Sequence, residues 1–151
     1  MSTLLVSSAR IPGGRLTFAA EESGVVHAGT FRGSEDLRTA PGTRLRRGAV
    51  PTVTRALQAY ADGDLTALDA IAVSQPGSAF QQACWQAMRT IPVGTVISYG
   101  ELAIRAGRVR AFRAAGSACA RNAVAPFVPC HRVVAAGGGL GGYGYGLAVK
   151  E

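Results

Sequence analysis

The sequence predicts an α/β protein in two parts, with a strand-rich first half and a helical second half. In the first half, short apolar runs that suit strands alternate with glycine-rich turns. In the second half, apolar residues recur at helical spacing behind serine caps. The break at Gln75-Pro76-Gly77 separates the two patterns, so we expect one domain over residues 1–75 and another over residues 76–151.

Composition and charge narrow the class of protein. The 151 residues are 48% hydrophobic and 17% charged, which excludes a chain that is disordered by composition. No apolar run approaches the roughly 18 residues of a membrane helix, and the first residues lack the basic region of a secretory signal. The net charge of +7 and the pI of about 10.2 are typical of a nucleic-acid-binding domain.

The cysteines indicate a reducing compartment. Cys84, Cys119 and Cys130 are odd in number, widely spaced and without a CxxC pair. We therefore expect thiols, no disulfide framework, and a cytoplasmic protein. With His27 and His131 as the histidines, the spacing suits no four-ligand zinc site, so we expect no metal.

Three strands and a helix are expected before the break. The apolar residues 4–6 and 16–20 flank Pro12-Gly13-Gly14, which predicts a strand, a turn and a strand, and residues 25–31 suit a third strand. The basic cluster at residues 44–47 is interpreted as a solvated loop face. A helix is predicted over residues 50–60.

The first helix of the second half is expected to run from a Ser78 cap to about Thr90, before Pro92 and Gly94. Its apolar residues follow the spacing i, i+3, i+4, i+7, i+8, i+11: Phe80, Ala83, Cys84, Ala87, Met88 and Ile91. Since Cys84 lies on that face, we expect it to be a buried structural thiol and not a reactive one.

Two further helices form a candidate helix-turn-helix. Ser98 and Glu101 have the spacing of a capping box, which predicts a helix to Ala106, and Gly107 suits its left-handed end. A second helix is expected over about residues 109–120.

The second of these helices is rich in alanine and offers little for reading base edges. Small residues allow close approach to a groove, and nearby arginines can contact phosphates: Arg108, Arg110, Arg113 and Arg121. This composition favours DNA binding that is largely independent of sequence. The alternative is a helix packed tightly on its neighbour, with its arginines in solvent.

Cys130 is the candidate nucleophile. His131 and Arg132 follow it directly; a cationic neighbour stabilises a thiolate, and histidine accepts a proton near neutral pH. Adjacent side chains of a regular strand point to opposite faces, so the pair needs an irregular backbone or a bridging water. The alternative is a core cysteine ahead of a strand at Val133 and Val134.

Residues 137–146 are rich in glycine and contain a literal GxGxxG. That fingerprint indicates dinucleotide binding only where it opens a helix within a βαβ unit. The chain ends at Glu151, so we interpret the segment as a loop that lines a site.

These motifs resemble the O(6)-alkylguanine-DNA alkyltransferase family, also called methylated-DNA–protein-cysteine methyltransferases. The active-site motif is the pentapeptide of residues 129–133, Pro-Cys-His-Arg-Val. The other matches occur in family order over about residues 78–150: Pro92-x-Gly94, Ser98-Tyr99-Gly100, Ala111-x-Arg113-Ala114, Arg121-Asn122, and Gly142-Tyr143 with Gly146-Leu147. The resemblance implies a ribonuclease-H-like α/β domain followed by a winged-helix-like DNA-binding domain.

The resemblance also implies a repair reaction in which each molecule acts once and no cofactor takes part. The alkyl group of O(6)-alkylguanine, or of O(4)-alkylthymine, passes irreversibly from duplex DNA to Cys130, after His131 deprotonates the thiol through a water. Tyr99 presses on the target phosphate, and Arg113 fills the gap that the flipped base leaves. Asn122 holds the turn before the active-site motif.

Further roles implied by the resemblance concern DNA and the guanine pocket. DNA contacts are expected from Tyr99, Gly100, Arg108, Arg113 and Arg121. The pocket is expected to be lined by Val128, Pro129, Tyr143, Gly144 and Tyr145. We expect a monomer that binds double-stranded DNA, associates with the nucleoid in a bacterium and does not contact membranes.

Two alternative functions stay open at the level of sequence. Members of the family carry a glutamate beyond this point that completes a Cys–His–Glu relay, and Glu151 does not match it by spacing. A protein that binds DNA lesions without transfer is therefore one alternative. A cysteine hydrolase is the other, although the sequence shows no third orienting residue and no oxyanion-hole motif for it.

Overall fold

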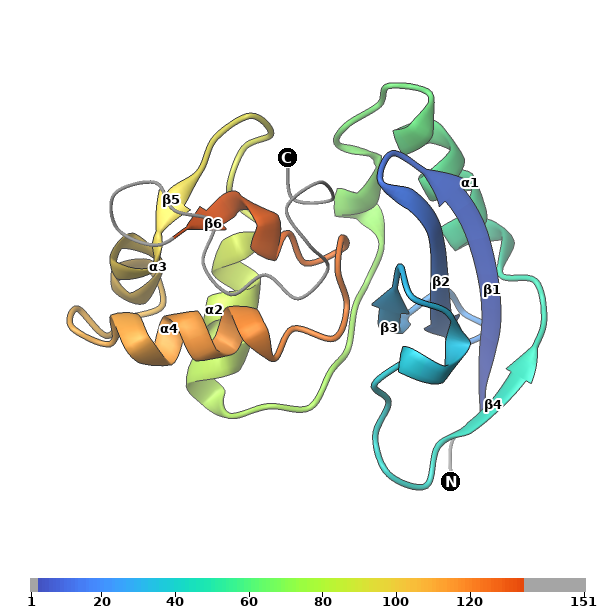
Figure 1. The fold of residues 1–151 in the computed structure, drawn as a ribbon, viewed down its shortest axis with the longest axis horizontal. Coiled ribbons are helices and arrows are strands. Elements are labelled where there is room, and N and C mark those ends of the chain that lie inside the picture. Colours follow the sequence, from blue (N-terminus) through green and yellow to red (C-terminus); the bar gives the residue numbers. More distant parts are fainter. Residues whose placement is uncertain (1–2, 135–151) are drawn as a thin grey trace. The chain divides into compact units, whose positions relative to one another are not determined.

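The computed structural model describes residues 3–134 and divides them into two compact units (Figure 1). The first unit contains the residues up to Pro76 together with Ala123–Phe127. The second contains Gly77–Asn122 and the residues from Val128 onward. The chain therefore enters the first unit a second time at Ala123–Phe127, shortly before the candidate nucleophile Cys130. The expected division near residue 76 did not include this return.

The first unit is built on a four-stranded sheet with the order β3-β2-β1-β4. Its strands are β1 (Thr3–Ile11), β2 (Gly14–Ala20), β3 (Val26–Thr30) and β4 (Arg44–Arg47). The pairs β1–β2 and β2–β3 are antiparallel, whereas β1 and β4 are parallel. Gly13 and Gly14 close the first hairpin with φ angles of 102° and 132°, which a residue with a Cβ rarely adopts.

The basic segment β4 corrects one sequence expectation. It is a strand and not a loop, because its backbone pairs with β1 from Thr3↔Arg44 to Val6↔Arg47. All four side chains are exposed, as expected of a solvated face. An edge strand with no buried side chain shows no alternation of apolar and polar residues, so its sequence gives no signal of a strand.

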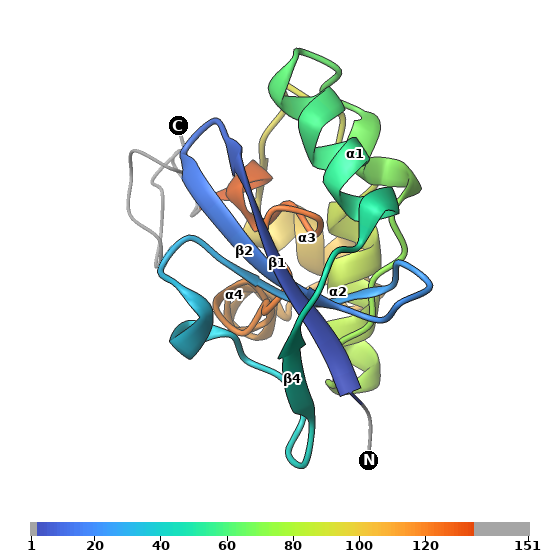
Figure 2. The same ribbon diagram turned by 90° about the vertical axis from the view of Figure 1, so that its right-hand side faces the viewer.

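The helix α1 (Pro51–Ala61) packs on β1 (Figure 2). Proline begins the helix, where its missing N–H and fixed φ are tolerated. Val53 and Leu57, one turn apart, are fully buried and supply the contact with the sheet. Two short 3₁₀ turns complete this unit, η1 (Ser34–Asp36) and η2 (Ala67–Ala70).

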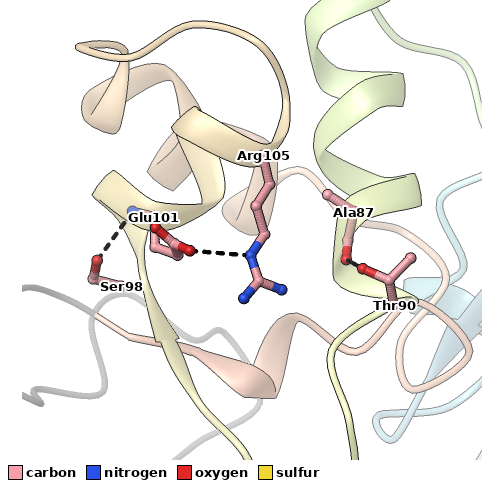
Figure 3. A network of polar contacts seen from close by, with 5 residues as sticks. All are labelled: Ala87, Thr90, Ser98, Glu101 and Arg105. Atoms are coloured by element: carbon pink, nitrogen blue, oxygen red, sulfur yellow. Dashed lines mark hydrogen bonds and ion pairs between the residues drawn. The ribbon is translucent and has the colours of Figure 1, made fainter.

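The described residues of the second unit form three helices, α2 (Ala79–Met88), α3 (Tyr99–Arg105) and α4 (Phe112–Ala120). The predicted cap of α2 is confirmed: the Gln81 amide donates to Ser78 Oγ at 3.1 Å, and the Ser78 amide donates to Gln81 Oε1 at 2.9 Å. The predicted apolar face is buried at Phe80, Cys84 and Met88. Thr90 Oγ1 donates to the Ala87 carbonyl just after the helix ends (Figure 3).

The helix α3 carries half of its predicted capping box. The Glu101 amide donates to Ser98 Oγ at 3.1 Å, but the Glu101 carboxylate accepts from Arg105 Nε, one turn later, at 3.3 Å (Figure 3). Gly107 ends the segment with a φ of 96°, as predicted. The next helix begins at Phe112, three residues later than expected, and Ala111 offers no side-chain cap to mark that start.

The expected α/β class is confirmed: a mixed sheet with one helix precedes a helical unit. A two-stranded parallel sheet of β5 (Ile97–Ser98) and β6 (Val133–Val134) completes the helical unit. Within residues 3–134, no helix has the length and hydrophobicity that crossing a membrane requires.

Candidate functional site

Cys130 begins a 3₁₀ turn, η3 (Cys130–Arg132), that leads directly into β6. Its amide donates to the Val128 carbonyl at 2.9 Å, and the Arg132 amide donates to the Pro129 carbonyl at 3.0 Å. The backbone at the cysteine is therefore irregular, which is one of the two arrangements expected for the Cys–His pair. Cys130 is 4% exposed, while His131 is partly exposed. The burial of Cys130 is compatible with a reactive thiol that a substrate reaches through a pocket, and it is equally compatible with a core cysteine.

Asn122 connects the end of α4 to this turn. Its Nδ2 donates to the Val128 carbonyl at 2.8 Å, and its side chain is almost fully buried. The Val128 oxygen thus accepts two hydrogen bonds, from the Asn122 side chain and from the Cys130 amide. A carbonyl that accepts two hydrogen bonds fixes the Val128–Pro129 peptide, one residue before the nucleophile.

The guanidinium of Arg132 is directed to a structural contact. Its Nη1 donates to the Ile91 carbonyl at 2.8 Å, in the segment that follows α2. This bond joins η3 to the segment just beyond the end of α2. Arg132 therefore holds the turn in place, a role that its position beside Cys130 in the sequence did not reveal.

The parallel pairing of β5 and β6 connects the η3 turn and α3 to opposite ends of one small sheet. Ser98 pairs with Val134, four residues after Cys130, and Tyr99 begins α3 directly after Ser98. Gly100 is the next residue of that helix. The η3 turn leads into the first residue of β6 and α3 follows the last residue of β5, so the sheet links the two elements although 30 residues separate them in sequence.

The small residues of α4 serve close packing. A Cβ on Gly116 would lie 3.5 Å from the Tyr99 ring, an ordinary contact distance, so the ring lies against this part of the helix and an alanine would also fit there. Ala115 and Ala118 are fully buried, and the Ala118 carbonyl accepts from Trp85 Nε1 at 2.9 Å. The packing alternative raised for this helix is therefore correct for its inner face.

The outer face of the α3–α4 pair is basic and partly apolar. Four arginines there are exposed: Arg108, Arg110, Arg113 and Arg121. The Arg113 Cζ atom lies 5.9 Å from the centre of the Phe112 ring, and the Arg108 Cζ atom lies 4.9 Å from the centre of the Phe80 ring. Aromatic surfaces hold such guanidinium groups without neutralising them. Val109 is 71% exposed and Phe112 is 52% exposed, so apolar groups accompany the charges.

The charge of the molecule is concentrated in the second unit. Eight of the sixteen basic residues but only two of the nine acidic residues lie at or after Gly77, which gives this part a net charge of +6 out of +7. The first unit is almost neutral by the same count. A field of one sign on one unit attracts a polyanion to that unit.

Cys84 and Cys119 lie in the helices α2 and α4, whereas Cys130 lies in the η3 turn. All three are thiols, and Cys84 is fully buried on α2. Burial raises the pKa of the Cys84 thiol from 9.0 to about 11, because a thiolate there would lose its solvation. This confirms Cys84 as a structural thiol.

Residues 3–134 include no group of three or more His, Cys, Asp or Glu side chains that could hold a metal ion.

The predicted site residues of the described chain fall in two neighbouring groups of the second unit. Asn122, Val128, Pro129, Cys130 and His131 belong to the turn after α4. Five others lie on or beside α3 and α4: Tyr99, Gly100, Arg108, Arg113 and Arg121. The predicted pocket residues Tyr143, Gly144 and Tyr145 lie outside the described residues.

Sequence reasoning missed two residues that contact the segment before the site. Gln75 had been assigned to the break between domains, and Gly29 to the interior of a strand. Gln75 accepts a hydrogen bond from the Ala123 amide and Gly29 donates one to the Ala123 carbonyl. Their partner is 48 or more residues away, and no local pattern signals such a contact.

Comparisons with known proteins point to one family. A family model described as the DNA-binding domain of 6-O-methylguanine DNA methyltransferase matches residues 79–151. The methylated-DNA–protein-cysteine methyltransferase of Methanosarcina acetivorans is 35% identical over 140 residues, which are 93% of this chain and 89% of that protein. The protein of the same name from Mycobacterium leprae is 49% identical over 103 residues, 68% of this chain and 62% of that protein.

A solved structure extends the likeness to three dimensions. The crystal structure of Mycobacterium tuberculosis OGT in complex with DNA matches with a TM-score of 0.78 and 35% identity. The match covers 95% of this chain and 85% of that chain, so it includes both units.

Proposed function

Because the chain belongs to the methylated-DNA–protein-cysteine methyltransferase family, we propose that Cys130 is the residue that accepts the alkyl group. The chain's activity is the repair of O(6)-methylguanine in DNA by transfer of the methyl group to a protein cysteine. The observation that supports Cys130 is its place at the first position of an irregular turn, with His131 beside it and with the Val128 carbonyl, two residues earlier, doubly hydrogen-bonded.

The proposed reaction is a single displacement at the methyl carbon. The Cys130 thiol gives its proton to His131 through a water, and the thiolate sulfur then bonds to the methyl carbon. The bond from that carbon to guanine O6 breaks, and its electron pair stays on the base. The base takes a proton back from the imidazolium, leaving guanine and S-methylcysteine. A thioether is not readily reversed, so each molecule repairs one lesion, and O(4)-alkylthymine fits the same chemistry.

The proposed DNA interface is the exposed basic face of α3 and α4. Arg108, Arg113 and Arg121, with Gly100 of α3, would contact the phosphate backbone, which binds largely without regard to sequence. Extraction of the alkylated base is required because an enzyme cannot reach its target atom inside a duplex. Tyr99, the first residue of α3, would press on the target phosphate, and Arg113 would occupy the gap.

We propose that one molecule of the protein acts on one DNA duplex. The protein would act as a monomer in the cytoplasm, on the nucleoid in a bacterium, with duplex DNA as its partner and without a cofactor. Val128 and Pro129, both buried ahead of the nucleophile, would form one wall of the guanine pocket. Asn122 would act by holding the Val128 peptide.

The test is the intact mass of the protein after incubation with duplex DNA that contains one O(6)-methylguanine. We expect one methyl group per chain, and peptide mapping should place it on Cys130. Cys84 and Cys119 in the same digest serve as internal controls. Cys130→Ser should bind the duplex and gain no mass, because its hydroxyl is not ionised at neutral pH. Specific binding of the lesion by the wild type without any mass gain would instead favour the lesion-binding alternative.

A further inference from the structure

The segment Ala123–Phe127, just before the active-site turn, is an unusual connection. It carries no charged side chain, and four of its five residues are buried, with Val124 and Ala125 fully so. Connections normally run over the surface, because a buried one carries backbone groups that water cannot reach. The backbone partners of this segment therefore decide whether it can stay in place.

Two residues of the first unit provide those partners at Ala123. The Gly29 amide donates to the Ala123 carbonyl at 2.8 Å, and Gln75 Oε1 accepts from the Ala123 amide at 2.8 Å. Gln75 is only 7% exposed, so this is a buried bond. Gly29 also forms a parallel bridge with Val124, which makes the segment a short extension of the sheet beside β3.

Gly29 is additionally required for space. A Cβ on Gly29 would lie 2.6 Å from the Ala125 carbonyl oxygen, a distance that Cβ atoms essentially never show. The obstructing atom belongs to backbone and cannot rotate away. Any larger residue at position 29 must therefore displace the segment, even though β3 itself could accept an alanine.

Displacement of the segment reaches the nucleophile over a short path. The chain leaves the segment at Phe127, and the next residue, Val128, holds the carbonyl that accepts from Asn122 and from the Cys130 amide. Ala123 follows Asn122 directly, so both ends of the segment adjoin this hydrogen-bonded peptide. A shift of the segment consequently strains the Asn122–Val128 bond and reorients the turn that begins at Cys130.

We propose that Gly29 and Gln75 are positioning residues for the transfer reaction, acting through Ala123 and Val128 on Cys130. The proposal rests on the function proposed above for Cys130. It assigns to the first unit a part in the chemical step, which is distinct from binding DNA. Neither residue touches the substrate; each sets the position of the backbone from which the nucleophile attacks.

The experiment measures single-turnover transfer from a methylated duplex at saturating protein, together with the Kd for unmodified duplex and the midpoint of thermal unfolding. Gln75→Met removes the acceptor at similar volume, whereas Gln75→Glu keeps an acceptor oxygen. Gly29→Ala tests the close approach independently. The control is Val53→Ala, which opens a cavity under α1, on the face that packs on β1, and should lower the unfolding midpoint.

We expect Gln75→Met and Gly29→Ala to lower the saturating rate constant by roughly tenfold to a hundredfold, the scale of a misplacement of about 1 Å. Duplex affinity should change less than about twofold, because α3 and α4 are untouched. Gln75→Glu should recover most of the rate, and Val53→Ala should lose stability while keeping the wild-type rate constant. All rates are taken well below the unfolding midpoints.

Two results would overturn the proposal. One is an unchanged rate constant in Gln75→Met, which decides the matter even where Gly29→Ala fails to fold. The other is an equal loss of rate in Val53→Ala, which would assign the effect to general destabilisation of the first unit. Failure of the wild type itself to take up a methyl group would instead refute the proposed function, so the two failures are distinguishable.

Discussion

Replacing Asn122 by alanine should weaken both the fold and the transfer reaction. The substitution removes the donor that lies 2.8 Å from the buried Val128 carbonyl, while the Cys130 amide remains as the second donor at 2.9 Å. A buried acceptor that loses one partner costs about 1–3 kcal/mol, and the surviving bond places this case near 1–2 kcal/mol. For a chain of this size, each kcal/mol shifts the unfolding midpoint by roughly 2–4 °C.

We therefore expect the midpoint of Asn122→Ala to fall by about 2–8 °C in differential scanning calorimetry. Single-turnover transfer should slow by about tenfold, because the peptide before the nucleophile loses one of its two restraints. Gln86→Ala, which removes an exposed amide side chain from α2, is the matched control and should leave both quantities unchanged.

Asn122→Asp sharpens the test through its pH dependence. At neutral pH a carboxylate oxygen would face the Val128 carbonyl oxygen, so this variant should be less stable than Asn122→Ala. Burial and that carbonyl raise the pKa of the introduced carboxyl in the folded state, and its protonated form can donate to the carbonyl. Stability should thus return as the pH falls from 8 toward about 5. If Asn122→Ala melts within about 1 °C of the wild type and transfers at the same rate, the role assigned to this hydrogen bond is wrong.

Three further predictions concern Arg113 on the proposed DNA face, the buried thiol of Cys84 and the Ser78 cap of α2. Arg113→Ala should slow transfer from duplex more than transfer from free O(6)-alkylguanine, because only the duplex requires extraction of the base; equal slowing of both would contradict this role. Cys84 should resist thiol reagents at pH 8, where about one thiol in a thousand is ionised at a pKa of about 11. Its raised pKa contributes stability that is lost as the pH rises from 9.0 toward about 11, which denaturant titrations over that range can measure. Ser78→Ala should cost about 1 kcal/mol in a denaturant titration, because the Gln81 amide loses its cap; an unchanged midpoint would argue against that cap.

The elements that the sequence predicted well are those marked by local chemistry. The first hairpin followed from Pro12-Gly13-Gly14, and α2 followed from its Ser78 cap and apolar spacing. The strand β4 was missed, because its exposed side chains carry no alternation and only its pairing with β1 defines it. The start of α4 was misplaced, since Ala111 gives no cap to read.

The candidate site divides in the same way. Cys130 and His131 could be identified from their chemistry, and the η3 turn supplies the irregular backbone that was one of two expected arrangements for the pair, the other being a bridging water. The bond from Arg132 to Ile91 spans 41 residues, and the bond from Ala123 to Gln75 spans 48. Contacts of that separation arise from how the elements pack, so no spacing rule along the chain reveals them.

The return of Ala123–Phe127 to the first unit has a consequence for how the protein can be divided. No single cut of the chain yields two complete modules. A fragment ending at Pro76 would leave the Gly29 amide and the Gln75 side chain without Ala123. The Gly29 end of β3 would lose its bridge to Val124 and present an exposed edge to other chains, whereas Val26 would keep its bridge to Val73. The complementary fragment would keep the five residues of this segment, four of them buried, with no sheet to join. We therefore expect the two units to occur, and to be expressed, as one continuous chain, although each has its own set of secondary-structure elements.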